Sequence, residues 1–240
     1  MNKKLIYIML SSISWFSNAM TIDTMLKISD DNGTGVFSIT NDLNETSFIK
    51  IKPAKVVSDN NGNLKKIEYN KDNFNEWEIS LTQSKVIVEP KRVKNIGVRS
   101  LCSESCDRTK DTVYAIKFLP SPYRKDGETK PSVTINYGYE ALFVIPAKNP
   151  EYKYNIKRIH DDVLFENKSN SLIRVSINQC NGQRKSNCSR SVVVLSGRNK
   201  RIKLPVNARQ DVLSLEILGY DNSFYEKSTL SKNKNIIRGM

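Results

Sequence analysis

Short runs of β-branched and aromatic residues recur along nearly the whole chain, and clusters of Asn, Asp, Gly, Lys and Ser separate them. The clearest runs are Gly35–Thr40, Phe48–Ile51, Lys85–Val88, Asn95–Leu101, Val113–Leu119, Leu172–Ile177, Ser191–Leu195, Arg201–Leu204 and Val212–Leu218. No window carries apolar residues at helical spacing over several turns. Many short strands with turn signals between them are typical of β-sandwiches, so the sequence predicts an all-β protein.

The length of the chain predicts two such domains. One sandwich of this kind takes about 100 residues, and the chain has 240. Two prolines bracket a polar stretch at Pro146–Pro150, which is the predicted hinge. We therefore expect one domain over residues 20–147 and a second over residues 148–240. The polar segments Ser58–Asn75 and Ser228–Met240 lack a strand pattern, so we expect a loop and a frayed end there.

Residues 1–19 have the three-part pattern of a secretory signal. Lys3-Lys4 precedes the apolar run Leu5–Leu10, and Ser17-Asn18-Ala19 places small residues one and three positions before a cleavage point. The alternative, a membrane anchor, needs about 20 apolar residues, and this run is shorter and interrupted by serines. The sequence therefore predicts export, removal of this segment and no membrane insertion.

The formal net charge of +13 at pH 7 favours acidic partners or surfaces. Nucleic acid is one such partner, but it is concentrated in the cytoplasm, from which this protein is predicted to be exported. The lysines are also dispersed, as in Lys50, Lys52 and Lys55, and form no continuous tract. We therefore expect a soluble basic protein with no nucleic-acid partner.

The four cysteines form two local pairs, Cys102 with Cys106 and Cys180 with Cys188. In an oxidising compartment, an even number of cysteines at short spacing indicates disulfides. A zinc site would need four converging ligands, and His160 is the only histidine. The sequence predicts two structural disulfides, each closing a loop between strands.

The stretch Ser132–Pro146 changes character along its length. In its first half, Val133, Ile135 and Tyr137 alternate with polar residues, which is the period of a strand with one solvated face. In its second half, Ala141–Ile145 is apolar at every position, which indicates a strand covered on both faces. One long strand is therefore expected to run from a buried core to an exposed apolar edge. Because such an edge promotes association, it is either a liability or a binding surface.

No motif makes a positive case for an enzyme. His160-Asp161-Asp162 has no nucleophile motif nearby, and a turn before a strand explains it better. Gly33-Thr34-Gly35 is too short for a phosphate-binding loop. Paired carboxylates for glycoside hydrolysis meet only in the fold, so their spacing in the sequence does not test that chemistry. We predict no catalytic residue, metal or cofactor.

Several segments follow one another in a recognisable order. They are Phe37–Asp42, Phe48–Ile51, Ser84–Pro90, Val113–Pro122, Ala141–Pro146, Asp162–Asn167 and Leu172–Val175, followed by the Cys180 and Cys188 pair. Their order and spacing resemble the PapD-like periplasmic chaperones of the chaperone–usher pilus pathway, over nearly the whole mature chain. Val144-Ile145 stands where that family often has Tyr-Arg, and Glu140-Ala141 where it has a basic residue. These departures resemble the divergent colonisation-factor and common-pilus branches.

The resemblance implies two immunoglobulin-like sandwiches joined by a short hinge in a boomerang arrangement. It implies a chaperone in the periplasm that stabilises pilin subunits by donor-strand complementation and delivers them to an outer-membrane usher. In that mechanism the chaperone lends one strand to a subunit that lacks its own last strand. Self-association of the free protein would also cover the lent strand. No cofactor is implied.

The resemblance also implies a binding strand and an anchor for the subunit's C-terminal carboxylate. We expect Val133, Ile135, Tyr137 and Tyr139 to face the subunit. The family anchor is a basic pair, for which Lys27 on the first strand and Lys117 on an adjoining strand are our candidates. A gap-free alignment places Met25 at the first position, and solvent exposure is the alternative interpretation of Lys117.

Two other classes of protein remain compatible with the sequence. A pilus adhesin or other structural subunit is also an exported sandwich protein with local disulfides. A sandwich-fold carbohydrate-active enzyme is the third possibility. A subunit should carry a groove-filling N-terminal extension and end in an apolar strand, whereas this chain ends in Lys234–Met240 (KNIIRGM).

Overall fold

The computed structural model describes residues 20–59, 62–102, 107–124, 137–180, 187–232 and 234–239. Within these ranges the chain forms strands β1–β18 and two short 3-10 helices, so the predicted all-β fold is confirmed. The strands make four sheets, two from the first part of the chain and two from the second.

The first sandwich contains ten strands and helix η1. They are β1 (Met20–Ile22), β2 (Leu26–Ile28), β3 (Thr34–Asn41), β4 (Ser47–Ser58), β5 (Leu64–Glu68), η1 (Lys71–Glu76), β6 (Ile79–Leu81), β7 (Lys85–Val88), β8 (Val93–Ser100), β9 (Thr112–Pro122) and β10 (Tyr139–Ile145). One sheet has the order β1-β3-β8-β6, and the other has the order β2-β10-β9-β4-β5 with β7 also pairing with β4.

Alternating side chains from these two sheets form the core of the first sandwich. Phe37 and Ile39 on β3 meet Ile116 and Phe118 on β9, and all four are almost fully buried. The rings of Phe37 and Phe118 contact edge to face, with centroids 5.7 Å apart. The period-two pattern in the sequence therefore places one face of each strand in this core.

The second sandwich contains eight strands and helix η2. They are β11 (Tyr154–Ile159), β12 (Asp162–Asn167), β13 (Ile173–Asn178), β14 (Ser189–Val194), β15 (Asn199–Lys203), η2 (Val206–Ala208), β16 (Val212–Leu218), β17 (Tyr225–Ser231) and β18 (Asn235–Arg238). The sheet orders are β15-β12-β11-β18 and β14-β13-β16-β17. Buried aliphatic residues from both sheets, with Tyr154 and Phe165, form its core.

Two segments differ from the sequence-based expectation. Ser58–Asn75 contains β5 and η1, and the C-terminal segment contains the end of β17 and all of β18. Among the described strands, β5 pairs only with β4 and β18 only with β11, so each is an edge strand with little apolar surface to bury. The expectations of a loop and a frayed end were therefore wrong, because edge strands can form without an alternating apolar pattern.

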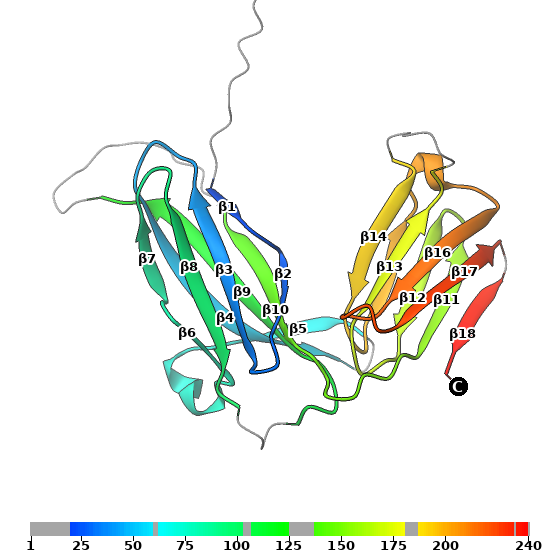
Figure 1. The fold of residues 1–240 in the computed structure, drawn as a ribbon, viewed down its shortest axis with the longest axis horizontal. Coiled ribbons are helices and arrows are strands. Elements are labelled where there is room, and N and C mark those ends of the chain that lie inside the picture. The colour runs from blue at the N-terminus through cyan, green and yellow to red at the C-terminus, as the bar shows by residue number, and fades with distance from the viewer. Residues whose placement is uncertain are drawn as a thin grey trace, which may run out of the picture.

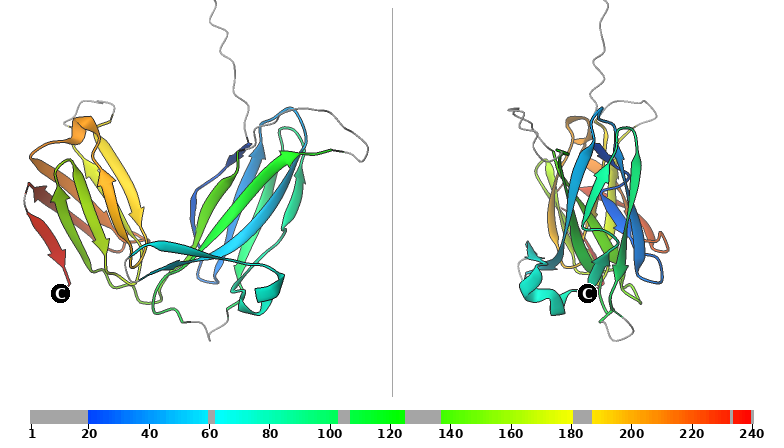
Figure 2. Two further views of the ribbon diagram at one scale, coloured as in Figure 1. Left: turned by 180° about the vertical axis from the view of Figure 1, so that it is seen from behind. Right: turned by 90° about the vertical axis from the view of Figure 1, so that its left-hand side faces the viewer.

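The two sandwiches diverge from a shared junction, so the molecule has the predicted boomerang shape (Figures 1 and 2). The last strand of the first sandwich ends at Ile145 and the first strand of the second begins at Tyr154. A separate apolar cluster joins the two, in which Val56, Val113 and Val144 contact Leu172 and Leu195. Where the boundary falls between Ile145 and Tyr154 stays a prediction.

Candidate functional site

Strand β10 is paired on both sides over only part of its length. It pairs with β9 in antiparallel register from Tyr139 to Ile145, but with β2 only from Leu142 to Val144. The amide of Leu142 donates to the carbonyl of Met25 at 2.9 Å. Within the described part of the chain, no strand pairs with the same side of β10 before Leu142. Because amides alternate along a strand, the amide of Glu140 points to this open side.

The edge is open because the first strand changes sheets. β1 pairs with β3 in one sheet, whereas β2 pairs with β10 in the other. Asp23, between them, fixes the crossing, since its amide donates to the carbonyl of Ser38 and its carboxylate accepts from the Ser38 amide. Only β2 is left to cover β10, and β2 is three residues long.

The two faces of β10 have different surroundings. Tyr139, Ala141 and Phe143 point into the core of the first sandwich. Leu142 and Val144 point to the opposite face, where they contact the apolar cluster at the junction. Tyr139, Ala141 and Phe143 thus continue the every-second-residue pattern of Val133, Ile135 and Tyr137 in the sequence.

The predicted binding residues fall in and before this strand. Tyr137 is 77% exposed and lies just before β10. Tyr139 packs against the core, and its hydroxyl donates to the carbonyl of Met20. Val133 and Ile135 lie outside the described residues. The contact between Tyr139 and Met20 was not predicted, because it depends on the crossing of the first strand.

Lys27 lies on β2 beside the point where the edge opens. It is in register with Phe143, so its side chain starts on the core-facing side of the sheet. Its ammonium forms an ion pair with Asp23 at 3.0 Å and lies 6.0 Å from the centre of the Phe37 ring. Partial burial raises the pKa of Asp23, but hydrogen bonds from Lys27 and Ser38 outweigh it and leave the pKa below the ordinary value.

Lys117 lies on the opposite face of the same sheet. It is in register with Glu140 on β10, and its ammonium is 2.5 Å from Glu68 and 3.8 Å from Glu140. Lys66 also pairs with Glu140, which makes an alternating row of four charges. A hydrogen bond to Glu68 raises the pKa of Lys117. The structure therefore does not bring Lys27 and Lys117 together.

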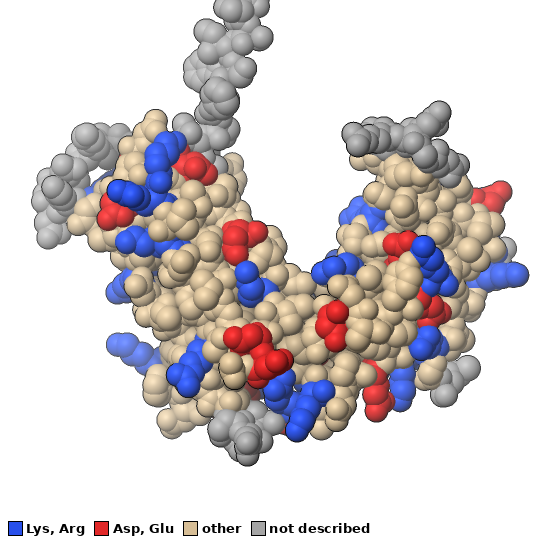
Figure 3. All heavy atoms as spheres, in the orientation of Figure 1, with Lys and Arg blue, Asp and Glu red and all other residues tan. Residues whose placement is uncertain are grey.

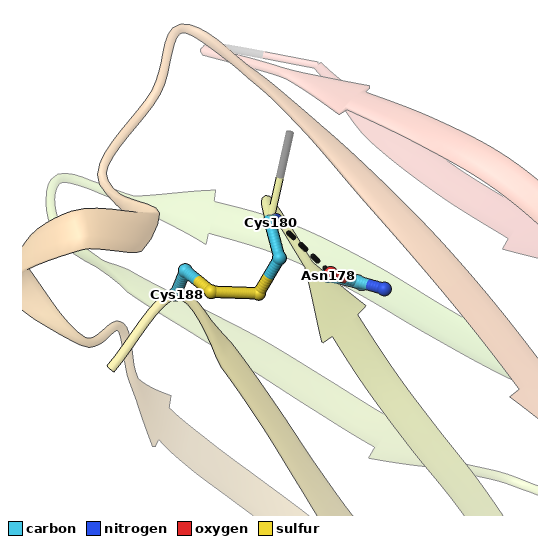
Figure 4. The surroundings of a disulfide bond; sticks show 3 residues. All are labelled: Asn178, Cys180 and Cys188. Atoms are coloured by element: carbon cyan, nitrogen blue, oxygen red, sulfur yellow. Dashed lines mark hydrogen bonds between the residues drawn. A yellow bond between two sulfur atoms is a disulfide. The ribbon is translucent and has the colours of Figure 1, made fainter. Parts of the chain in front are cut away.

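The disulfide between Cys180 and Cys188 is confirmed. It joins the end of β13 to the start of β14, with Cα atoms 5.2 Å apart, and Asn178 accepts a hydrogen bond from the Cys180 amide (Figure 4). Cys102 is also disulfide-bonded, but its predicted partner Cys106 lies outside the described residues.

A buried carboxylate at the junction was not predicted. Asp111 accepts hydrogen bonds from the amide of Ala147, within the predicted hinge segment Pro146–Pro150, at 2.9 Å and from that of Leu172, in the second sandwich, at 2.7 Å. Burial raises the pKa of Asp111, and the two amides oppose this shift without cancelling it. Beside it, a cavity of 640 Å³ is lined by residues of both sandwiches, among them Lys55 and Gly197.

Other features of the surface bear on the classes of function considered above. Basic and acidic side chains are interspersed on the face shown in Figure 3 and do not form a continuous basic area. Among the described residues, no group of three or more His, Cys, Asp or Glu side chains is arranged to hold a metal ion. No helix within those residues has the length and apolar character needed to cross a membrane.

His160 lies in the hairpin between β11 and β12, and its two acidic neighbours are engaged in ion pairs. Asp161 pairs with Arg209 at 3.0 Å and Asp162 pairs with Arg201 at 2.5 Å. These contacts agree with the interpretation of this tripeptide as a turn.

The fold is that of two-domain pilus chaperones. The crystal structure of the class 5 fimbriae chaperone CfaA is 17% identical, with a TM-score of 0.50, and the match covers 91% of this chain and 97% of that one. A chain of the Salmonella enterica SafA pilin–SafB chaperone complex is 7% identical, with a TM-score of 0.56 and coverage of 89% and 97%. The E. coli chaperone DraB is 7% identical, with a TM-score of 0.55 and coverage of 90% and 97%. At these identities the likeness shows the fold alone.

Family membership comes from the sequence match. Residues 22–146 match the model described as the CS5 fimbrial protein N-terminal domain, which is more than half of the chain. The chain therefore belongs to the CS5 fimbrial protein family. No curated protein matches the sequence.

Proposed function

We propose that this protein is a periplasmic chaperone that binds pilus subunits by adding its own strand to them and passes them to an outer-membrane usher. The observation that carries the proposal is the open side of β10 before Leu142, next to an alternating apolar sequence. The solved structures of similar fold are named as chaperones, one of them as a fimbriae chaperone and another in complex with a pilin.

Strand addition uses groups that the edge leaves free. A partner strand can accept from the Glu140 amide and continue the sheet, while alternate apolar side chains enter its groove. Tyr137 has the same parity as Tyr139, Ala141 and Phe143, which face the core of the chaperone. If β10 is extended towards the N-terminus with the same alternation, Val133 and Ile135 lie on the same face of the strand as Tyr137. On that face they can pack into the groove of the subunit. Each large apolar side chain so buried contributes roughly 1.5–3 kcal/mol.

A structural subunit is the main alternative, and the first sandwich argues against it. A pilin lacks its last strand, so its core is open along a groove. Here the last strand of the first sandwich is β10, which lies between β9 and β2. Phe143 is fully buried in the core that this strand completes. The chain thus supplies the last strand of its own first sandwich, and β10 keeps one side open before Leu142.

Lys27 is our preferred anchor for the subunit's C-terminal carboxylate. It lies on β2, beside the point where the partner strand must end because β2 takes its place. Lys117 is in register with Glu140 on the other face, where Glu68 and Glu140 already neutralise its charge. Side chains on opposite faces of a sheet cannot share one carboxylate, so Lys117 stays a separate hypothesis.

Co-purification from the periplasm tests the proposed function. The chaperone should bring a pilin with it in a one-to-one ratio, and Ile135→Asp should abolish this recovery, because a charge buried without a partner is costly. Asn136→Asp is the matched control. Residue 136 points to the opposite face of the strand from residue 135, so this variant should leave recovery unchanged. Normal recovery with Ile135→Asp, in a variant with unchanged circular dichroism, would contradict the proposal.

A further inference from the structure

Three segments of the second sandwich converge at the end of β11 that is distant from the hinge. They are the hairpin from β11 to β12, the segment before β16 and the end of β17. This part of the molecule has no place in the strand-addition mechanism. One arginine, Arg158, links two of the three segments through its side chain.

Arg158 is buried at the end of the core. It follows Tyr154 and Ile156 on the inward face of β11, and only 8% of it is exposed. Its Nε donates to the carbonyl of His160, and its Nη1 donates to the carbonyls of Gln210 and Asp211. These three bonds use three of the five N–H groups of a guanidinium. The remaining two are on Nη2, which is buried and has no acceptor within the described structure.

The charge of Arg158 is also left without a direct partner. The two carboxylates of the same region are engaged elsewhere, Asp161 with Arg209 at 3.0 Å and Asp211 with Lys232 at 2.6 Å. Among the described residues, no carboxylate lies within ion-pair distance of Arg158. Neutral carbonyls satisfy some of its donors, but they do not neutralise its charge. A buried guanidinium without an anion is unfavourable, and an oxyanion would remove the cost.

A hollow of about 530 Å³ is present at this place. It is lined by Arg158, Ile159, His160, Asp161 and Lys232. We propose that it is an oxyanion-binding site in which Nη2 of Arg158 donates to a carboxylate or phosphate group. Nη2 can donate an N–H group to an oxygen of such a group. Asp161 and Asp211 each pair with one cation here, Arg209 and Lys232, so the charge of Arg158 is left over as one net positive charge at this place. The site is separate from β10, so it does not depend on the proposed chaperone function.

Titration followed by nuclear magnetic resonance tests the site in the intact mature chain. Sodium phosphate, sodium acetate and sodium chloride are added separately at constant ionic strength, and the Nε–H signal of Arg158 and the amide signals of His160 and Asp161 are followed. We expect saturable shifts with phosphate, acetate or both, and none with chloride. A response to phosphate alone identifies the ligand class as phosphate, whereas a response to acetate identifies a carboxylate site. No saturable shift with either oxyanion up to tens of millimolar would overturn the proposal.

A pair of variants then locates the binding. Arg158→Gln should lower the oxyanion affinity at least tenfold, and Arg190→Gln, an exposed arginine on β14 of the same sandwich, should leave it unchanged. If Arg158→Gln does not fold, Lys232→Gln takes its place and should weaken the affinity several-fold. Equal affinity in the wild-type protein and in whichever of these two variants is measured would contradict the assignment.

Discussion

Single residues at the fork between β1 and β2 determine where one side of β10, the strand that we propose binds the subunit, is left unpaired. Asp23 ties the fork to Ser38, and Lys27 is held by Asp23. Tyr139 is held by the Met20 carbonyl. These bonds hold β1 in the other sheet, so its backbone does not pair with β10 beside Tyr139–Ala141. The fork is therefore a fixed part of the sandwich, and a partner strand does not have to displace it.

The anchor is tested by replacing the two lysines one at a time. A hydrogen bond to a carboxylate contributes roughly 1.5–3 kcal/mol, so Lys27→Ala should weaken binding of a peptide with the subunit's C-terminal sequence by about tenfold or more. Lys117→Ala is measured alongside, with Lys85→Ala on the exposed edge strand β7 as the control. If neither Lys27→Ala nor Lys117→Ala changes the affinity by more than twofold, the anchor lies elsewhere.

Among the secondary-structure elements, the buried strands were predictable and the edges were not. Val113–Leu119 is apolar at every position except Lys117, so β9 was expected from its own residues. β5 has exposed lysines and a glutamate, and its strand form depends on pairing with β4. Side chains that pack on a core leave a pattern in the sequence, whereas a backbone ladder at an edge leaves none.

The same distinction explains which parts of the site were predicted. The alternation before Tyr139 gave the candidate binding face, because it is a local pattern. The crossing of the first strand and the ion pairs of Lys117 with Glu68 and Glu140 depend on pairing between distant segments. No local pattern records such pairings, which is why the lysines could be named from the sequence but not placed.

The disulfide between β13 and β14 should stabilise the second sandwich through its short loop. The bonded cysteines are eight positions apart, for which restriction of the unfolded chain predicts a contribution of about 2.5 kcal/mol. Replacing Cys180 and Cys188 together by Ser should lower the free energy of unfolding of this sandwich by about that amount in urea titrations. An unchanged midpoint and slope would show that the loop is already restricted without the bond.

At the scale of the whole molecule, Asp111 joins the two sandwiches. Its carboxylate accepts hydrogen bonds from the amides of Ala147, within the predicted hinge, and of Leu172, in the second sandwich. Asn170 adds donations to the carbonyls of Thr109, which precedes β9, and of Asn149, within the predicted hinge. Together with the apolar cluster, these bonds connect the two sandwiches, and we expect them to restrict the angle between the two.

Asp111→Ala should loosen this junction without unfolding either sandwich. It leaves two buried amides unsatisfied, at a cost of about 1–3 kcal/mol each, so small-angle scattering should show a broader distribution of shapes. Asp107→Ala is the control, since the hydrogen bonds of Asp107 within the described residues go to Thr109 in its own loop. A distribution as narrow as that of the wild-type protein would show that the apolar cluster alone fixes the angle.

The pH dependence of stability offers a second test of Asp111. Its pKa in the folded protein is raised by burial, so this group favours folding most below the ordinary value of 3.8 and loses that contribution as the pH rises through the raised pKa. In Asp111→Asn the contribution of this carboxyl group to the pH dependence of the free energy of unfolding should be absent. A pH dependence identical to that of the wild-type protein would contradict the assignment.

Hydrogen exchange at β10 tests the central claim most directly. The Glu140 amide points to the open side of the strand, whereas that of Leu142 is already bonded to Met25. Binding of a subunit by strand addition should slow exchange at Glu140 by about tenfold or more relative to the free protein, and leave Leu142 nearly unchanged. Formation of a one-to-one complex with no change at Glu140, or with protection confined to other edges such as β6 or β18, would contradict the account.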